Sequence, residues 1–125
     1  MFIRFNPNPF ELNTGDCTVR ALSKVLNQSW DDTYWGICIV GFELGTMPSN
    51  NRIWGEYLMR NGFKRFSLPN TCPMCYTVRQ FCEDHPYGIY VLATGSHVIA
   101  IEHGDYYDNW DSGMETIVYA FRKGQ

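Results

Sequence analysis

Residues 14–26 read TGDCTVRALSKVL, and this stretch decides how the N-terminal half of the chain folds. Apolar residues recur in it at the spacing that lines one face of an α-helix, at Val19, Leu22, Val25 and Leu26. Polar residues that cap helix N-termini come just before, at Asn13, Thr14 and Asp16. We therefore predict a helix over residues 17–27, with Cys17 in its first turn.

Similar signals predict three more helices and, before the first one, an irregular arm. Residues 1–12 contain Pro7 and Pro9, which favour an extended arm or loop. Capping residues and helical periodicity predict helices over residues 29–40, 51–60 and 78–84. The third is expected to end at a left-handed Asn61-Gly62 cap, and the fourth stops at His85-Pro86.

The character of the sequence changes after Gly88, where runs of β-branched, aromatic and aliphatic residues follow one another. They predict strands over residues 89–92, 97–101, 106–108 and 116–121. Turn residues separate them, at Gly95-Ser96 and at His103-Gly104-Asp105. The prediction is an α+β fold in which a helical N-terminal half, with its Cys-bearing helix, packs on a C-terminal antiparallel sheet. We expect residues 1–125 to form one domain, since the length suits a single core.

Bulk properties exclude several classes of partner. The net charge is -3 and Lys and Arg form no run, so we expect no nucleic-acid binding. No apolar run is long enough to cross a bilayer and no signal peptide is apparent, so we expect no membrane association. Five cysteines without an export signal indicate reduced thiols and a cytoplasmic protein. The sequence does not set an oligomeric state.

Cys17 is the first candidate for chemistry. Free N–H groups and aligned peptide dipoles at a helix N-terminus stabilise a thiolate, the form of cysteine that attacks carbonyl groups. The preceding Gly15 lets a substrate approach the backbone closely. The alternative is that Cys17 is a buried packing residue, as free cysteines often are.

His97 and the residues after the last turn supply the candidate partners of Cys17. His97 opens a predicted strand, and its hairpin partner ends in Tyr-Asp-Asn-Trp-Asp over residues 107–111. The hairpin therefore returns a carboxylate or an amide to the neighbourhood of His97, the arrangement of a nucleophile, a base and an orienting group. Asp108 is the first choice for the orienting group, and Asn109 and Asp111 are its rivals because the sequence leaves the register open. Trp110 either shields this pair or belongs to the core.

Taken together, residues 14–22 (TGDCTVRAL), residues 95–101 (GSHVIAI) and residues 107–111 (YDNWD) resemble papain-like cysteine peptidases. They are more closely similar to small papain-fold proteins of bacteria and their phages, and more distantly to the bacteriocin-leader peptidases. The likeness covers most of the chain in order: a Cys-bearing helix, further helices, then a sheet with His before Asp.

The resemblance implies a thiol protease acting on a peptide or protein without a cofactor. Cys17 attacks an amide or isopeptide bond, His97 acts as base and then acid, and Asp108 orients His97. The family also has a Gln before the Cys as oxyanion donor, whereas here Asn13 is the nearest amide and Asn8 the next. The alternatives are a transglutaminase or acyltransferase, or an inactive papain-like module that binds a peptide or protein partner.

The other polar and aromatic residues have simpler interpretations. Cys72, Cys75, Cys82 and His85 have a spacing that could bind zinc, although Cys82 also fits the inner face of the fourth helix. Arg20 is expected to be a structural ion-pair partner rather than a catalytic group. Four aromatic residues are predicted to fill the core between helices, with some lining a substrate groove: Trp30, Tyr34, Trp35 and Trp54.

Overall fold

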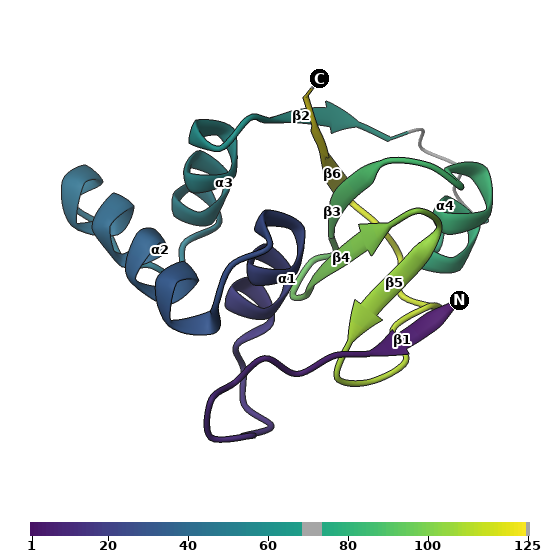
Figure 1. Cartoon of the computed structure of the whole chain (residues 1–125). Helices are drawn as coiled ribbons and strands as arrows, with labels where there is room; N and C mark the ends of the chain where they lie inside the picture. The colour runs from purple at the N-terminus through teal and green to yellow at the C-terminus, as the bar shows by residue number, and fades with distance from the viewer. Residues whose placement is uncertain (69–73, 125) are drawn as a thin grey trace.

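The computed structural model describes residues 1–68 and 74–124, and over these it has four helices and six strands (Figure 1). The helices are α1 (Cys17–Leu26), α2 (Trp30–Leu44), α3 (Asn51–Arg60) and α4 (Val78–Asp84). The strands are β1 (Phe2–Arg4), β2 (Phe63–Ser67), β3 (Ile89–Ala93), β4 (Val98–Glu102), β5 (Asp105–Asp108) and β6 (Tyr119–Lys123). The predicted α+β class is confirmed.

The sheet has the strand order β1-β5-β4-β3-β6-β2, and its composition differs from the prediction. Two strands, β1 and β2, come from the part of the chain before Gly88, and β1 pairs with β5 in parallel, so the sheet is mixed rather than antiparallel. β1 lies within residues 1–12, which were predicted to be an irregular arm. It was not predicted as a strand because it has only three residues and Pro7 follows closely. β2 (FKRFS) escaped prediction because its two aromatic residues are three apart and break the alternation typical of strands.

Local signals explain where the helices begin and end. Ser29 caps α2 by accepting a bond from the Asp32 N–H at 3.0 Å, and a left-handed Gly45 ends that helix four residues beyond the predicted bound. α4 has the predicted cap, a reciprocal capping box between Thr77 and Gln80. The last strand begins later than predicted, because residues 116–118 make only isolated contacts before β6.

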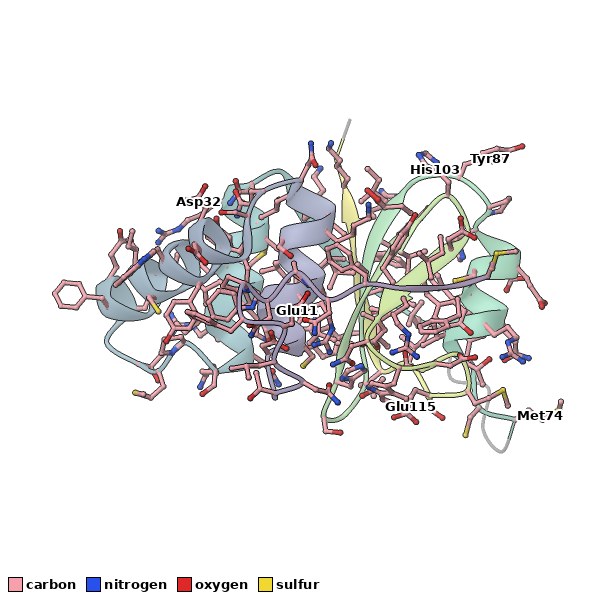
Figure 2. The ribbon with its side chains drawn as sticks, turned by 60° about the horizontal axis from the view of Figure 1, so that its bottom comes forward. Glu11, Asp32, Met74, Tyr87, His103 and Glu115 are labelled. Atoms are coloured by element: carbon pink, nitrogen blue, oxygen red, sulfur yellow. The ribbon has the colours of Figure 1, made fainter. Side chains whose placement is uncertain are left out.

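The sheet is covered on both faces, so two apolar clusters form. Helices α1, α2 and α3 lie on one side of the sheet and α4 on the other, with α2 farthest from the sheet (Figures 1 and 2). The strands alternate accordingly: Val98 and Ala100 belong to the cluster under α1, whereas Ile99 and Ile101 belong to the cluster under α4. Of the aromatic residues predicted to fill the core, Trp54 is buried and Trp35 is 65% exposed, which corrects that prediction for Trp35.

No helix within residues 1–68 and 74–124 is long and apolar enough to cross a membrane.

Candidate active site

Cys17 is the first residue of α1 and is half-buried. Asp16 occupies the N-cap position, but its side chain does not cap the helix. Its carboxylate instead accepts bonds from Arg20 at 2.6 Å and from Trp30 Nε1 at 2.9 Å. The space beside Gly15 is open, since a Cβ built there would meet no atom within 4 Å. The helix N-terminus, with its partial positive charge, is thus left for Cys17.

The β4–β5 hairpin brings His97 and Asp108 together. The turn is tight because His103 and Gly104, between the paired Glu102 and Asp105, both have positive φ. The resulting register pairs Ala100 with Tyr107, so β5 ends near the start of β4. There the Nε2 atom of His97 lies 2.6 Å from Asp108 Oδ2.

Asp108 is fully buried, and each of its oxygens has two partners. Oδ2 contacts His97 and accepts a bond from Ser112 Oγ at 2.7 Å. Oδ1 accepts a bond from the Asn109 N–H at 2.8 Å and lies 3.1 Å from Arg20 Nη2. Burial alone would raise the pKa of Asp108, but the bonds from His97 and Ser112 and the nearby positive charges hold it below its ordinary value. Asp108 is therefore a carboxylate at neutral pH.

The His97 ring lies between Asp108 and Cys17. Burial disfavours its charged form, but the bonds and charges of Asp108 and Cys17 outweigh burial and raise the pKa of His97 to about 9. The Trp110 ring covers His97, with the two ring centres 5.1 Å apart. An imidazolium is therefore favoured at neutral pH.

The thiol of Cys17 has the matching shift. Burial would raise its pKa, yet the pKa is lowered, because His97 supplies a hydrogen bond and a positive charge, the Val98 N–H donates to the sulfur, and Arg20 adds charge. The pair thus favours a thiolate beside an imidazolium, the form in which cysteine is nucleophilic.

Arg20 connects the two ends of this cluster. Its guanidinium is 3% exposed and contacts Asp16 Oδ1 at 2.6 Å and Asp108 Oδ1 at 3.1 Å. The sequence led us to expect a structural ion pair, and the contacts fit that expectation. The sequence did not predict that Arg20 would join Asp16, the residue before Cys17, to Asp108, the partner of His97.

The residues named as alternatives lie elsewhere. Asp111 accepts a bond from the Tyr106 hydroxyl at 2.5 Å and lies near Arg79. Asn109 gives its side-chain N–H to Asn13 Oδ1 at 2.6 Å. His97 is thus bonded to Asp108 rather than to either rival.

The two amides named as oxyanion donors differ in how they are held. Asn8 is buried, and its Oδ1 accepts bonds from the Phe10 and Leu12 N–H groups, so it orders the loop before α1. Its Nδ2 faces Asp16 at 3.4 Å. Asn13 is exposed and is bonded to Asn109 through its oxygen. Asn13 is therefore the amide that remains a candidate donor.

The possible zinc ligands do not form a site in the described part of the chain. Cys72 lies outside the described residues, and residues 1–68 and 74–124 contain no group of three candidate ligands. Cys75 is exposed, and Cys82 is buried on the inner face of α4. His85 stacks on Phe81 with ring centres 3.9 Å apart, and its Nδ1 lies 2.9 Å from the Phe81 carbonyl oxygen.

Sequence reasoning missed Ser112, Asp16 and Trp30 as members of the cluster. Ser112 is four residues after Asp108, a spacing at which a tight loop returns a hydroxyl to a carboxylate. Asp16 precedes α1 and Trp30 follows it. Trp30 donates a hydrogen bond to Asp16, and no sequence pattern predicts this pairing.

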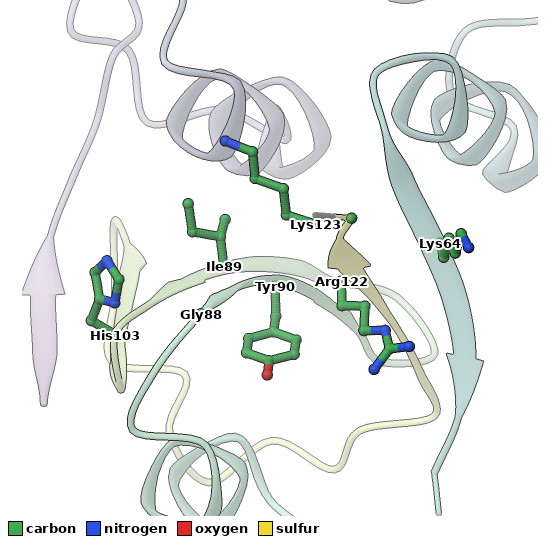
Figure 3. A pocket seen from close by; sticks show the side chains of 8 residues that line it. Lys64, Gly88, Ile89, Tyr90, His103, Arg122 and Lys123 are labelled. Atoms are coloured by element: carbon green, nitrogen blue, oxygen red, sulfur yellow. The ribbon is translucent and has the colours of Figure 1, made fainter.

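A pocket of about 730 Å³ at the opposite end of the sheet has no part in this cluster. It is lined by residues around the start of β3 and the end of β6, and includes none of Cys17, His97 and Asp108. Figure 3 shows the side chains of Lys123 and Arg122 pointing to opposite sides of the sheet. Lys123 and Arg122 therefore do not converge on one ligand position.

Comparisons of the chain with protein-family models, with curated proteins and with solved structures found no match. The function is therefore inferred from the residues of this chain alone.

Proposed function

We propose that the protein is a cysteine hydrolase of the papain-like kind that cleaves an amide or isopeptide bond through an acyl-thioester on Cys17. The observation that carries the proposal is the pair formed by His97 and the buried Asp108, with Nε2 and Oδ2 2.6 Å apart, in which the His97 ring lowers the pKa of Cys17 at the start of α1. The order of elements supports the papain-like fold: a nucleophile at a helix N-terminus, then His97 directly before β4 and Asp108 at the end of its partner strand β5.

In the first half of the reaction, the Cys17 thiolate attacks the carbonyl carbon and forms a C–S bond. His97 Nε2 is engaged by Asp108, so Nδ1 is the nitrogen that faces the sulfur and the leaving group. The imidazolium gives its proton to the leaving amine as the C–N bond breaks. The products of this half are a free amine, an acyl-thioester and a neutral His97.

In the second half, neutral His97 takes a proton from water, which attacks the thioester. The C–S bond breaks, the product leaves as a carboxylic acid, and the thiolate–imidazolium pair is restored. Throughout, Asp108 keeps the same bond to Nε2 and stabilises the charge on the ring. An amine in place of water would give acyl transfer instead.

The oxyanion formed during attack needs donors close to the sulfur. The N-terminal amides of α1 are suitable, because no side chain among the described residues caps that helix end. The Asn13 side chain is a second candidate, held by Asn109 through its oxygen.

A catalytically inactive module that binds a peptide or protein partner is the second candidate. The absence of a Gln before Cys17 favours it, as does the involvement of Asn13 with Asn109 rather than with the space beside the thiol.

Acylation by p-nitrophenyl acetate tests the proposal. We expect release of p-nitrophenol and, by peptide mass spectrometry, an acetyl group on Cys17 that hydroxylamine removes. Cys17→Ala should abolish both signals, whereas Cys82→Ala, the matched control, should keep them.

Cleavage of an unselected peptide mixture in ¹⁸O-water then identifies the reaction. New carboxyl termini that carry ¹⁸O indicate hydrolysis, and new amide-linked products indicate acyl transfer. Absence of acylation in the wild type would contradict the proposed chemistry in favour of the binding module.

A further inference from the structure

We propose that the edge of the sheet at β2 binds an acidic, extended polypeptide segment as a further strand. This inference does not rest on the chemistry of Cys17, because β3 and β6 separate β2 from the strands that hold His97 and Asp108. It is carried by the open backbone of β2, by cations on both faces of this edge, and by the lack of acidic residues on the two strands that hold them.

The backbone of β2 is paired on one side. β2 is the last strand in the order of the sheet, and it pairs with β6 over residues 63–67. Within residues 1–68 and 74–124, no other segment forms a hydrogen bond with the backbone of residues 63–67. The outer side of the strand therefore presents donors and acceptors that an added strand satisfies.

This edge of the sheet is strongly basic. Four of the ten Lys and Arg residues of the chain lie on β2 and β6, and all four are exposed: Lys64, Arg65, Arg122 and Lys123. Residues 61–68 and 116–124 contain no Asp or Glu. Arg65 lies over the Tyr119 ring at 4.2 Å, and the other three cations have no ion-pair or hydrogen-bond partner in the described part of the chain. The edge thus offers positive charge to a partner, although the net charge of the chain is -3.

The register places these cations on both faces of the sheet. Lys64 pairs with Arg122, so their side chains lie on one face, where Tyr90 is the next neighbour of Arg122. Arg65 and Lys123, each one residue further on, lie on the other face, as Figure 3 shows for Lys123. Like charges directly opposite each other destabilise a sheet, so an acidic partner relieves the repulsion between Lys64 and Arg122.

A strand fits this arrangement better than a small anion does. Arg122 and Lys123 point to opposite sides and do not converge, but the side chains of an added strand also alternate between the two faces. Such a strand lies roughly 10 Å from β6, which is two strand spacings. Arg or Lys and Glu side chains together bridge that distance. The pocket of about 730 Å³, lined by Lys64, Arg122 and Lys123 among others, gives these side chains room.

Protection of the edge accounts for only part of this charge. Charged residues on an edge strand prevent edge-to-edge pairing of copies, and Lys64 and Arg65 fit that role. That role does not require cations on the inner strand β6, yet Arg122 and Lys123 lie beside them. The other edge strand, β1, has three residues and one cation, Arg4, whose guanidinium already has a hydrogen-bond acceptor. β2 is therefore the edge whose charges select an acidic strand.

Three fluorescein-labelled peptides test the proposal by fluorescence anisotropy. Each has four central residues flanked by Thr: Glu in the first, Gln in the second, and Glu with N-methylated backbone amides in the third. We expect the Glu peptide to bind, and the other two to bind about tenfold more weakly, because one lacks the charge and the other the N–H donors.

Arg122→Gln should weaken binding of the Glu peptide by up to about fivefold, the contribution of one exposed ion pair. Arg52→Gln is the matched control, because Arg52 is also exposed but lies on α3, and it should leave the affinity unchanged. Equal effects of the two substitutions would mean that only the net charge matters, which would overturn the proposal.

Hydrogen exchange locates the bound segment. The Glu peptide should slow amide exchange in residues 63–67 and leave residues 2–4, at the other edge, unchanged. Absence of binding, or protection that leaves residues 63–67 out, would overturn the proposal. So would equal binding of the N-methylated peptide or of an oligothymidylate of eight nucleotides, since either result would show a general polyanion surface. None of these outcomes changes the case for Cys17, which is tested separately by acylation.

Discussion

Cys17 and Cys82 lie on helices that pack against opposite faces of the same sheet, and the pKa values of their thiols are shifted in opposite directions. Burial favours the neutral thiol at both positions. At Cys82 burial prevails, with Asp105 and Glu83 adding to it, and raises the pKa to about 11. At Cys17 the pKa falls, because His97, the Val98 N–H and Arg20 favour the thiolate.

Position on the helix contributes to the same contrast. Cys17 opens α1, where the helix end carries partial positive charge, whereas Cys82 is the fifth residue of the seven-residue α4. The comparison indicates that the polar partners of Cys17 outweigh the effect of burial on its thiol pKa, whereas at Cys82 burial prevails.

The largest expected effect is the loss of stability when the Arg20 guanidinium, near Cys17, is removed. Arg20→Met would leave the buried carboxylates of Asp16 and Asp108 without their shared cation. We expect the free energy of unfolding to fall by about 3–5 kcal/mol in urea titrations. Arg60→Met, which removes exposed pairs with Glu43 and Glu56, should cost about 1 kcal/mol or less. Equal costs would contradict the role given to Arg20.

The second effect is on the rate of thiol alkylation. Replacing His97 should bring the reactivity of Cys17 closer to that of Cys82. At pH 6 an ordinary thiol is only about 0.3% ionised, so His97→Ala should slow alkylation of Cys17 by up to about 100-fold. His85→Ala, on the face of the sheet that holds Cys82, is the control and should leave the Cys17 rate as it is. A fast Cys17 in the His97 variant would show that the imidazole does not hold the thiolate.

The third effect is a pH dependence of stability, measured in a Cys17→Ala background so that the thiolate does not titrate. A histidine whose folded pKa is raised stabilises the protein fully below its unfolded pKa of about 6.5, and this stabilisation is lost as the pH rises through the folded pKa. We expect Asp108 alone to keep the pKa of His97 raised in this background, below the value of about 9 that it has beside Cys17.

The difference in unfolding free energy between Cys17→Ala and Cys17→Ala/His97→Ala should accordingly shrink by roughly 1–2 kcal/mol between pH 6.5 and pH 9. A difference that stays constant, or grows, across this range would mean that Asp108 does not stabilise the imidazolium.

The smallest effect concerns Ser112. Its hydroxyl is one of four partners of Asp108, so Ser112→Ala should cost about 1 kcal/mol and slow Cys17 alkylation only a few fold. Ser96→Ala, at an exposed turn position, should change neither quantity. An effect on alkylation as large as that of His97→Ala would indicate that Ser112 acts on the ring directly.

The contrast between the two cysteines also explains how much could be predicted from the sequence. Local signals were sufficient for the position of Cys17 at a helix start, for the cap of α4 and for the turn at His103-Gly104, because each depends on neighbouring residues. They were also sufficient to name Cys17 and His97, and they limited the orienting group to Asp108, Asn109 or Asp111.

The rest depends on contacts between segments distant in the chain. The parallel pairing of β1 with β5 joins residues about a hundred positions apart. The three residues of β1 are too few to show the alternation that predicts a strand. The choice of Asp108 over Asn109 and Asp111 needed the hairpin register, in which a one-residue shift reverses the face of every side chain. The bridge made by Arg20 needed the packing of α1 on the sheet.

The most direct test compares the pH dependence of iodoacetamide alkylation at Cys17 and Cys82 within one folded chain, read by peptide mass spectrometry. We predict that Cys17 keeps reacting well below pH 8.5, the ordinary thiol pKa, while Cys82 stays slow until the pH approaches 11 or the protein unfolds. A Cys17 rate that follows an ordinary thiol, or that equals the Cys82 rate at neutral pH, would contradict the claim that His97 and the α1 N-terminus hold a thiolate.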